Sequence, residues 1–484
     1  MSIRSAAVVA LALAAACARN PVTGKRQLAL VSTEQEIALG KEAAQQVTES
    51  IGRYPDPKLQ AYVEEIGKRM AAKSERPDLP WSFTVLDDPT VNAFALPGGP
   101  VFVTRGLLTH MNTEAELASV VGHETGHITA RHSVQDLSKA QLAQLGLGLG
   151  SILNERVAQA AQVAGAGLQL LFLRYSRDHE RQADELGFKY MVAQGYDPHE
   201  MAHVFTTLER ASAQQGQGKL PEWLSTHPDP GNRAETAEKR AAEVKNPGTK
   251  TDRDEYLAHL EGMKFGEDPR QGFFQGNAFL HPDLQLKIDF PAGWQKANGA
   301  EAVMAQSPKK DAIIQLTTAG KTSPEEAAKK FFSQKGVKPA SLAAGATAGL
   351  PPNTRTFEAQ TDKGQLGGLV SFFSHRGVTL GILAYTPMAS LGAYAPAFQA
   401  TAASFGPLTD PAALAVQPAR IQLVKVPRDM TVAEFNAQFP STAPAETVAL
   451  VNGIAKDGRL EAGRTAKRIV GGVPPKAGDA APKS

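Results

Sequence analysis

The amino-acid sequence predicts an α+β protein that is mainly helical in its first half and richer in strands after about residue 272. Three observations support this prediction. Apolar residues recur at helical spacing through Val63 and Ile66, residues 81–104 are rich in β-branched and aromatic side chains, and residues 284–290 alternate strictly. With 484 residues, 42% of them hydrophobic, the chain is long enough for two or three domains with hydrophobic cores.

Changes in composition divide the chain into five parts. These are a signal peptide (1–16), a mainly helical domain with a small sheet (17–265), a small α+β domain (272–405), a small C-terminal unit (419–472) and a disordered tail (473–484). The formal net charge of +2 gives no electrostatic reason to expect nucleic-acid binding.

The first seventeen residues are typical of an export signal. Arg4 supplies a positive charge, residues 5–16 form an apolar run of small side chains, and Cys17 is the only cysteine. We expect cleavage before Cys17 and attachment of lipid to it, although an ordinary signal peptide is the alternative. Ala18, rather than an aspartate, favours the outer membrane over retention at the inner one.

Local patterns predict the first elements of the helical domain. Ser32 or Thr33 caps a helix, with Glu36 placed for the capping box of Thr33. Residues 81–104 hold two strand-like runs, and the Pro-Gly-Gly-Pro turn at 97–100 between them predicts a small hairpin-like sheet.

A helix is predicted over residues 113–135, with Thr113 as its cap and Glu116 completing a capping box. The Gly-, Ala- and Leu-rich residues 142–173 follow it. Polar residues at 154–156 interrupt that stretch, so we expect an amphipathic helical pair that covers the preceding helix and not a transmembrane segment.

The helix at 113–135 carries the sequence HETGH, an HExxH motif, at residues 123–127. Residues four apart lie on one face of a helix, so His123 and His127 can bind one metal ion, with Glu124 beside them as a general base. The alternative is a surface helix with two incidental histidines. His132 would lie off this face of a continuous helix, so we interpret it as structural.

A third ligand is expected downstream of the motif. A metzincin would require Gly at 130 and His at 133, where this chain has Ala130 and Ser133. A glutamate from a later helix is the other arrangement, and SRDHERQAD (176–184) offers Glu180. Asp184, one turn further on, is placed to accept a hydrogen bond from a ligating histidine.

Together these motifs resemble the gluzincin zinc metallopeptidases, the family that includes the CAAX prenyl protease, HtpX and the periplasmic BepA-like proteases. The resemblance covers about residues 20–265 and rests on NPVTGKRQL, NAFALPGG, HETGH, SRDHERQAD and STHPDPGNR. It implies one zinc ion per chain, bound by His123, His127 and Glu180, with Asp184 orienting a ligand.

The same resemblance implies further roles. His227 and Arg233 would stabilise the oxyanion, and in BepA-like members the equivalent histidine also approaches zinc as an inhibitory fourth ligand. A loop histidine without a role is the alternative for His227. A substrate would lie extended along an edge strand formed by Asn92, Ala93, Phe94 and Ala95.

From these features we expect an endopeptidase that degrades misfolded or misassembled cell-envelope proteins at the periplasmic face of the outer membrane, anchored through lipid. The alternative is an assembly chaperone whose proteolysis is latent. The motif FPAGW (290–294) gives the 272–405 domain a weak resemblance to PsbP. Residues 419–472 faintly resemble LysM, which predicts peptidoglycan as a partner, and a small packing module is the alternative.

Overall fold

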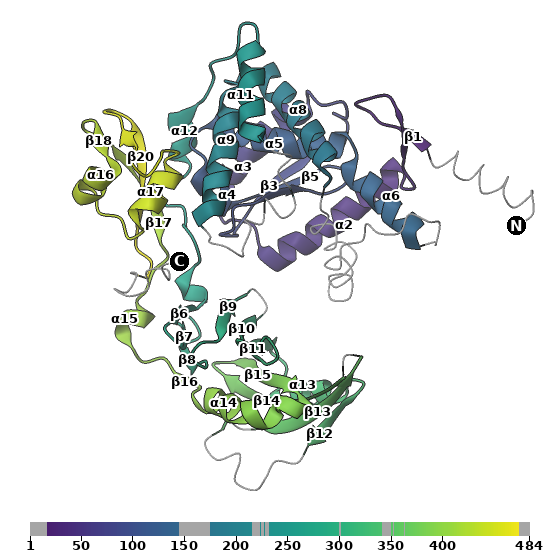
Figure 1. Cartoon of the computed structure of the whole chain (residues 1–484), viewed down its shortest axis with the longest axis vertical. Coiled ribbons are helices and arrows are strands. Elements are labelled where there is room, and N and C mark those ends of the chain that lie inside the picture. Colours follow the sequence, from purple (N-terminus) through teal and green to yellow (C-terminus); the bar gives the residue numbers. More distant parts are fainter. Residues whose placement is uncertain are drawn as a thin grey trace, which may run out of the picture. The chain divides into compact units, whose positions relative to one another are not determined.

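A computed structural model describes residues 17–144, 175–214, 223, 227, 232–299, 302–340, 350–351, 353–362 and 364–473. The chain forms two compact units (Figure 1). The first contains the described residues up to Glu267 together with Ala419–Val470, and the second contains Asp268–Pro418. Both units mix helices with strands, which confirms the predicted α+β class.

The first unit begins with a helical region and a small sheet. Its helices are α2 (Thr33–Ile51), α3 (Pro57–Ala71), α4 (Arg105–His110), α5 (Glu114–Thr129), α6 (His132–Gln144), α8 (Arg177–Ala193), α9 (Glu200–Gln214), α11 (Arg233–Glu243) and α12 (Arg253–Ala258). Its strands are β1 (Cys17–Arg19), β2 (Arg26–Leu28), β3 (Ser82–Leu86), β4 (Ala93–Ala95) and β5 (Pro100–Thr104). One hydrophobic core joins α3, α5 and α8 to the sheet.

Helix α2 begins after Ser32, one of the two caps that the sequence allows. Ser32 and Gln35 exchange side-chain-to-backbone hydrogen bonds, which completes a capping box. The predicted box through Glu36 is therefore wrong. Glu36 is instead buried, where it forms ion pairs with Arg76 at 2.7 Å and Arg131 at 3.0 Å. These two guanidinium groups compensate the cost of burying its charge.

The small sheet has the strand order β3-β5-β4. Strands β4 and β5 form the hairpin, and its turn needs glycine because Gly98 and Gly99 both have positive φ, 79° and 135°. The predicted direct hairpin between the two strand-like runs is wrong, because β3 pairs with β5 in parallel. The intervening residues contain β4, which reverses the chain before β5.

The predicted helix over 113–135 is interrupted. Helix α5 ends at Thr129, Arg131 adopts a left-handed φ of 60°, and α6 starts at His132. The break is held by the Arg131 guanidinium, which donates to the carbonyl of Val31 at 2.9 Å and pairs with Glu36. These contacts offset a backbone conformation that is unfavourable for residues other than glycine.

The start of α5 agrees with the prediction only in part. Thr113 caps the helix by accepting a hydrogen bond from the backbone N–H of Glu116. The Glu116 side chain, however, accepts from the N–H of Asn112, so the predicted capping box is not formed. Glu114, in the first turn, is buried and accepts hydrogen bonds from Tyr62 and Arg69, each at 2.7 Å.

Helices α5 and α8 cross in close contact at glycines. A Cβ added to Gly187 would lie 2.7 Å from the backbone nitrogen of His123, and one added to Gly122 would lie 3.1 Å from the Cα of Gly187. A side chain at either position would push the helices apart. The first turn of α8, which carries Glu180, therefore lies directly against the HExxH face of α5.

The C-terminal part of the first unit consists of β17 (Arg420–Lys425), β18 (Met430–Thr431), α16 (Val432–Gln438), α17 (Ala445–Val451), β19 (Arg459–Leu460) and β20 (Thr465–Val470). It has a small core of its own, centred on Phe435, and α17 packs on α4 and α9. Lys467 of β20 is fully buried, and its ammonium donates to the carbonyls of Thr109 at 2.9 Å and Met111 at 2.6 Å. The LysM-like character of this part stays a prediction.

The second unit is inserted between the two parts of the first. The chain leaves and re-enters the first unit at adjacent points, since the N–H of Phe265 donates to the carbonyl of Ala419 at 2.8 Å. The inserted helices are η2 (Pro269–Gln271), α13 (Pro324–Phe332), η3 (Met388–Ser390), α14 (Leu391–Ala403) and α15 (Pro411–Leu414).

Antiparallel pairing joins the strands of this unit into two sheets, ordered β12-β13-β14-β15-β11-β10-β9 and β16-β8-β7-β6. Its strands are β6 (Phe273–Gln275), β7 (Ala278–His281), β8 (Leu286–Asp289), β9 (Gln295–Asn298), β10 (Ala302–Gln306), β11 (Ile313–Gly320), β12 (Val337–Ala340), β13 (Arg355–Thr361), β14 (Gly364–His375), β15 (Val378–Pro387) and β16 (Gly406–Pro407). The strictly alternating run at 284–290 forms β8, as its pattern predicts.

Several predicted segments lie outside the described residues. These are the signal-like residues 1–16, most of the Gly-rich stretch 142–173 and nearly all of the tail 473–484. Among the helices in the described ranges, none combines the length and apolarity needed to cross a bilayer.

Replacement of Lys467 by Met should lower the free energy of unfolding by about 2–4 kcal/mol, because two buried carbonyls lose their donor. Urea denaturation followed by circular dichroism measures this loss. Lys456→Met, at an exposed position of the same C-terminal part, is the matched control and should have little effect. Equal destabilisation by the two substitutions would show that the Lys467 side chain does not stabilise the end of α4.

Candidate metal centre

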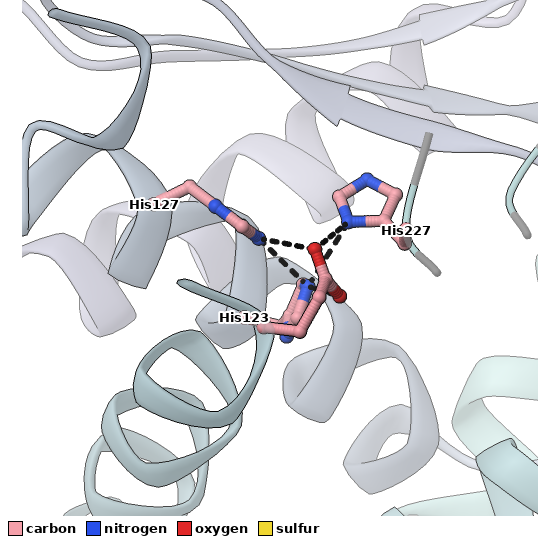
Figure 2. Close-up of side chains that lie close together, drawn as sticks. His123, His127 and His227 are labelled. Atoms are coloured by element: carbon pink, nitrogen blue, oxygen red, sulfur yellow. Dashed lines mark hydrogen bonds and ion pairs between the residues drawn. The ribbon is translucent and has the colours of Figure 1, made fainter. Parts of the chain in front are cut away.

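Two helices and one residue outside them bring four ligand groups to one point. His123 and His127 come from α5, Glu180 from the first turn of α8, and His227 from the chain before α11. One side-chain nitrogen or oxygen of each lies within 4.8 Å of those of the others, and all four residues are buried. Figure 2 shows the three labelled histidine rings turned toward the same carboxylate.

The two motif histidines present their Nε2 atoms to this point. The Nε2 atoms of His123 and His127 are 3.0 Å apart, and each lies 3.5 Å from an oxygen of Glu180. Residues four apart on α5 share this face, as the sequence predicts. The close crossing of α5 and α8 at Gly122 and Gly187 brings the glutamate of α8 within reach.

His123 is held from behind by Asp184, in agreement with its predicted position. Its Nδ1 lies 2.9 Å from the Asp184 carboxylate, one helical turn after Glu180. Arg233, the first residue of α11, binds both oxygens of Asp184 at 2.6 and 3.0 Å. Burial opposes ionisation of Asp184, but the Arg233 charge prevails and lowers the pKa to about 2. The guanidinium also lies over the ring of Phe205, 4.2 Å from its centroid.

His227 occupies the fourth position of the cluster. Its Nδ1 lies 3.1 Å from Glu180 and 3.3 Å from the Nε2 of His123, while its Nε2 lies 3.6 Å from Glu124. Trp223 stacks on the His227 ring at 4.2 Å, and its carbonyl accepts a 2.7 Å hydrogen bond from the His227 N–H. Residues 228–231, which make up most of the predicted Pro-rich loop, lie outside the described residues.

Glu124 and Glu180 are buried carboxylates with different electrostatics. Burial raises the pKa of Glu124, and among the described residues no group donates a hydrogen bond to either of its oxygens. Burial also opposes the ionisation of Glu180, but the charges of His227, His123 and Arg233 outweigh it and lower the pKa. Glu180 is therefore ready to bind a cation, and Glu124 is suited to accept a proton.

These residues fit a metal ion. Three imidazole nitrogens and a carboxylate converge, and Oε2 of Glu180 accepts no hydrogen bond within the described ranges. Such a donor set matches the preferences of zinc, for which two histidines and one glutamate form a known catalytic arrangement.

Strand β4 lies at the edge of its sheet and packs beside α5. Asn92 accepts from the N–H of Thr104, and Phe94 pairs with Phe102, so the backbone groups of Ala93 and Ala95 point to the open edge. Ala93 and Ala95 have buried side chains, and Phe94 is half-buried. On β4, as far as the described residues show, a ligand could therefore contact backbone groups and the Phe94 side chain. Cys17 begins β1, which pairs with β2.

Sequence reasoning missed three aromatic neighbours of the site. Tyr175 stacks on His127 with ring centroids 3.9 Å apart, Trp223 covers His227, and His132 contacts His127 with its Nδ1 at 2.9 Å. The prediction that His132 lies away from the motif face assumed an unbroken helix. The break at Arg131 turns His132 back toward His127.

The comparison with protein families agrees with this arrangement. Residues 57–241 match the model of peptidase family M48. This segment contains the motif helix, the edge strand and all four residues of the cluster. The chain therefore carries a peptidase family M48 domain, as the resemblance in its motifs predicts.

Curated relatives support the same class. The chain is 32% identical over 259 residues to the beta-barrel assembly-enhancing protease of Yersinia pestis, covering 51% of this chain and 52% of that protein. It is 30% identical over 308 residues to the Escherichia coli protein of the same name, covering 62% and 60%. The mitochondrial metalloendopeptidase OMA1 of Schizosaccharomyces pombe is 34% identical over 213 residues, covering 43% and 61%.

The chain thus spans about half to three fifths of the length of these relatives. Among solved structures, cyanobacterial PsbP from Synechocystis covers 27% of this chain and is itself 91% covered, at 15% identity and a TM-score of 0.21. A score at that level does not support a fold assignment, so the PsbP-like character of the 272–405 domain stays a prediction.

Proposed function

We propose that this protein is a zinc metalloendopeptidase that cleaves misfolded or misassembled proteins of the bacterial cell envelope. The convergence of His123, His127 and Glu180 on one point, with the carboxylate of Glu124 beside it, carries the proposal. The peptidase family M48 match and the metalloendopeptidase and assembly-enhancing protease names of the relatives support it.

Zinc bound by His123, His127 and Glu180 would polarise the scissile carbonyl and make a water molecule more acidic. Glu124 would take the proton of the attacking water, because burial raises the pKa of its carboxyl group and, among the described residues, no group donates a hydrogen bond to its oxygens. It then passes that proton to the leaving amine. Asp184, held by Arg233, keeps His123 in its orientation.

Substrate binding would use the open edge of β4. An extended peptide added beside Ala93 and Ala95 would receive backbone hydrogen bonds and become a fourth strand. Recognition through backbone groups is largely independent of sequence. It requires an unfolded segment, which supports misfolded or unassembled proteins as the substrate class.

Replacing Glu124 by Gln should abolish most proteolysis while keeping the metal. We expect casein cleavage to fall by about a hundredfold to ten-thousandfold, because the amide cannot accept the proton of the water. Metal analysis should find about one zinc per chain in both proteins.

A His123→Ala, His127→Ala double variant is the control, since it should lose both zinc and activity. Cleavage by Glu124→Gln at the wild-type rate would rule out Glu124 as the base. Zinc retained in full by the double variant would rule out the proposed ligands.

The second candidate function is an assembly chaperone with latent proteolysis. His227 favours it, because its Nδ1 lies in the ligand cluster and a fourth protein ligand would close the site to water and substrate. In an active state, His227 would instead donate a hydrogen bond to the oxyanion, with Arg233 adding positive charge nearby. Both functions use the same residue in different positions.

Replacing His227 by Ala should have opposite effects on two substrates. Cleavage of a folded protein should rise, because the site is no longer closed. Cleavage of unfolded casein should fall, because one oxyanion donor is lost. Rates are measured on both substrates beside His199→Ala, an exposed histidine outside the cluster. Unchanged rates on both would assign His227 neither role.

Localisation is proposed from the N-terminal sequence. Lipid on Cys17 would anchor the protein at the periplasmic face of the outer membrane, and peptidoglycan remains a proposed partner of residues 419–472. Cells fed labelled palmitate should label the wild type but not Cys17→Ser, and only the variant should leave the membrane fraction. Equal fractionation of the two proteins would contradict the anchor.

A further inference from the structure

The second histidine of the HExxH motif has a histidine behind it. The Nδ1 of His127, which faces away from the cluster, lies 2.9 Å from the Nδ1 of His132. The Nε2 of His132 in turn lies 3.0 Å from the Oε1 of Gln182, on α8. A continuous chain of hydrogen bonds therefore runs from α8 through His132 to a proposed metal ligand.

The chemistry of the three side chains fixes which atom donates and which accepts in both hydrogen bonds. An amide oxygen only accepts, so the proton of neutral His132 resides on Nε2, and its Nδ1 carries a lone pair. That lone pair must accept, so the proton of His127 resides on Nδ1. The Nε2 of His127 is then free of a proton, which is the state required of a metal ligand.

The surroundings hold His132 in this neutral orientation. Its ring is fully buried and stacks on His179, with centroids 4.1 Å apart and planes 10° from parallel. The Nδ1 of His179 lies 3.4 Å from the carboxylate of Asp136. This carboxylate therefore pairs with His179 and not with His132.

The two motif histidines are thus oriented by different groups. His123 contacts the ionised carboxylate of Asp184, whereas His127 contacts a neutral imidazole. A carboxylate partner strengthens a histidine as a donor, while a neutral acceptor mainly fixes its tautomer and ring angle. The break between α5 and α6 makes this contact possible, because the left-handed Arg131 turns the chain so that His132 lies against His127, five residues earlier.

We propose that His132, itself oriented by Gln182, is a positioning residue that fixes the tautomer of His127 and thereby sets the zinc affinity of the centre. The proposal rests on the metal-binding role proposed above. His132 contacts His127 on the side that faces away from the cluster, contributes no ligand atom of its own, and takes no part in proton transfer to the substrate.

The test is the apparent zinc affinity, measured by competition with a chromophoric chelator. We expect His132→Leu to bind zinc about 10- to 100-fold more weakly than the wild type. His132→Asn should retain most of the affinity, because the Oδ1 of asparagine occupies the place of Nδ1 and always accepts. His199→Leu, at an exposed histidine, should be unchanged.

Gln182→Leu separates tautomer control from packing. In the wild-type background it should weaken zinc binding, since nothing then holds the proton on Nε2 of His132. In the His132→Asn background it should have no further effect, because an amide oxygen needs no partner to remain an acceptor. The visible spectrum of the Co²⁺-substituted proteins should change with the same pattern.

Equal zinc affinity of the wild type and folded His132→Leu would overturn this inference alone. If His132→Leu does not fold, His132→Asn and Gln182→Leu decide it. Equal losses from Gln182→Leu in both backgrounds would reject the tautomer mechanism. Absence of zinc from the wild type would overturn both this inference and the proposed function.

Discussion

The close crossing of α5 and α8 determines the rest of this site. The two backbones touch because neither Gly122 nor Gly187 carries a side chain, and a methyl group at Gly187 would lie 2.7 Å from the backbone of His123. Glutamate has a short side chain, so Glu180 reaches the motif histidines only from a helix this near. The same contact brings Asp184 to His123 and Gln182 to His132. Three residues of α8, two positions apart in the sequence, thus contact both motif histidines or the histidine behind them.

Two buried clusters keep α5 fixed against this crossing. At its start, Glu114 is held by Tyr62, Arg69 and Lys250, with Lys250 at 2.9 Å. At its end, Arg131 pairs with Glu36 of α2 and stabilises the backbone turn. Buried ion pairs contribute little net stability, but each specifies one arrangement because an unpaired buried charge is costly. The helix is therefore constrained where small shifts would change the distances between ligands.

The sequence predicted a structural feature correctly where a short pattern of neighbouring residues determines that feature. The spacing of His123 and His127 on one helix and the glycine turn at 97–100 follow from rules that span a few residues, whereas Glu180 was expected from the resemblance to a family. Predictions failed where distant residues compete for a side chain. Glu36 fits a capping box locally, but two arginines bind it in the folded chain. The position of His132 depends on a left-handed Arg131, which only its long-range contacts stabilise.

The buried lysine near the end of the chain also links folding to biosynthesis. Lys467 lies 358 residues after Thr109, whose carbonyl it binds, and the whole second unit is encoded between them. During translation, the turn that leads into α5 therefore remains without its donor until Asp268–Pro418 and the strand that carries Lys467 have been made. We expect nascent and prematurely terminated chains to hold this turn loosely. Synthesis of β20 would then be a requirement for a rigid candidate metal centre.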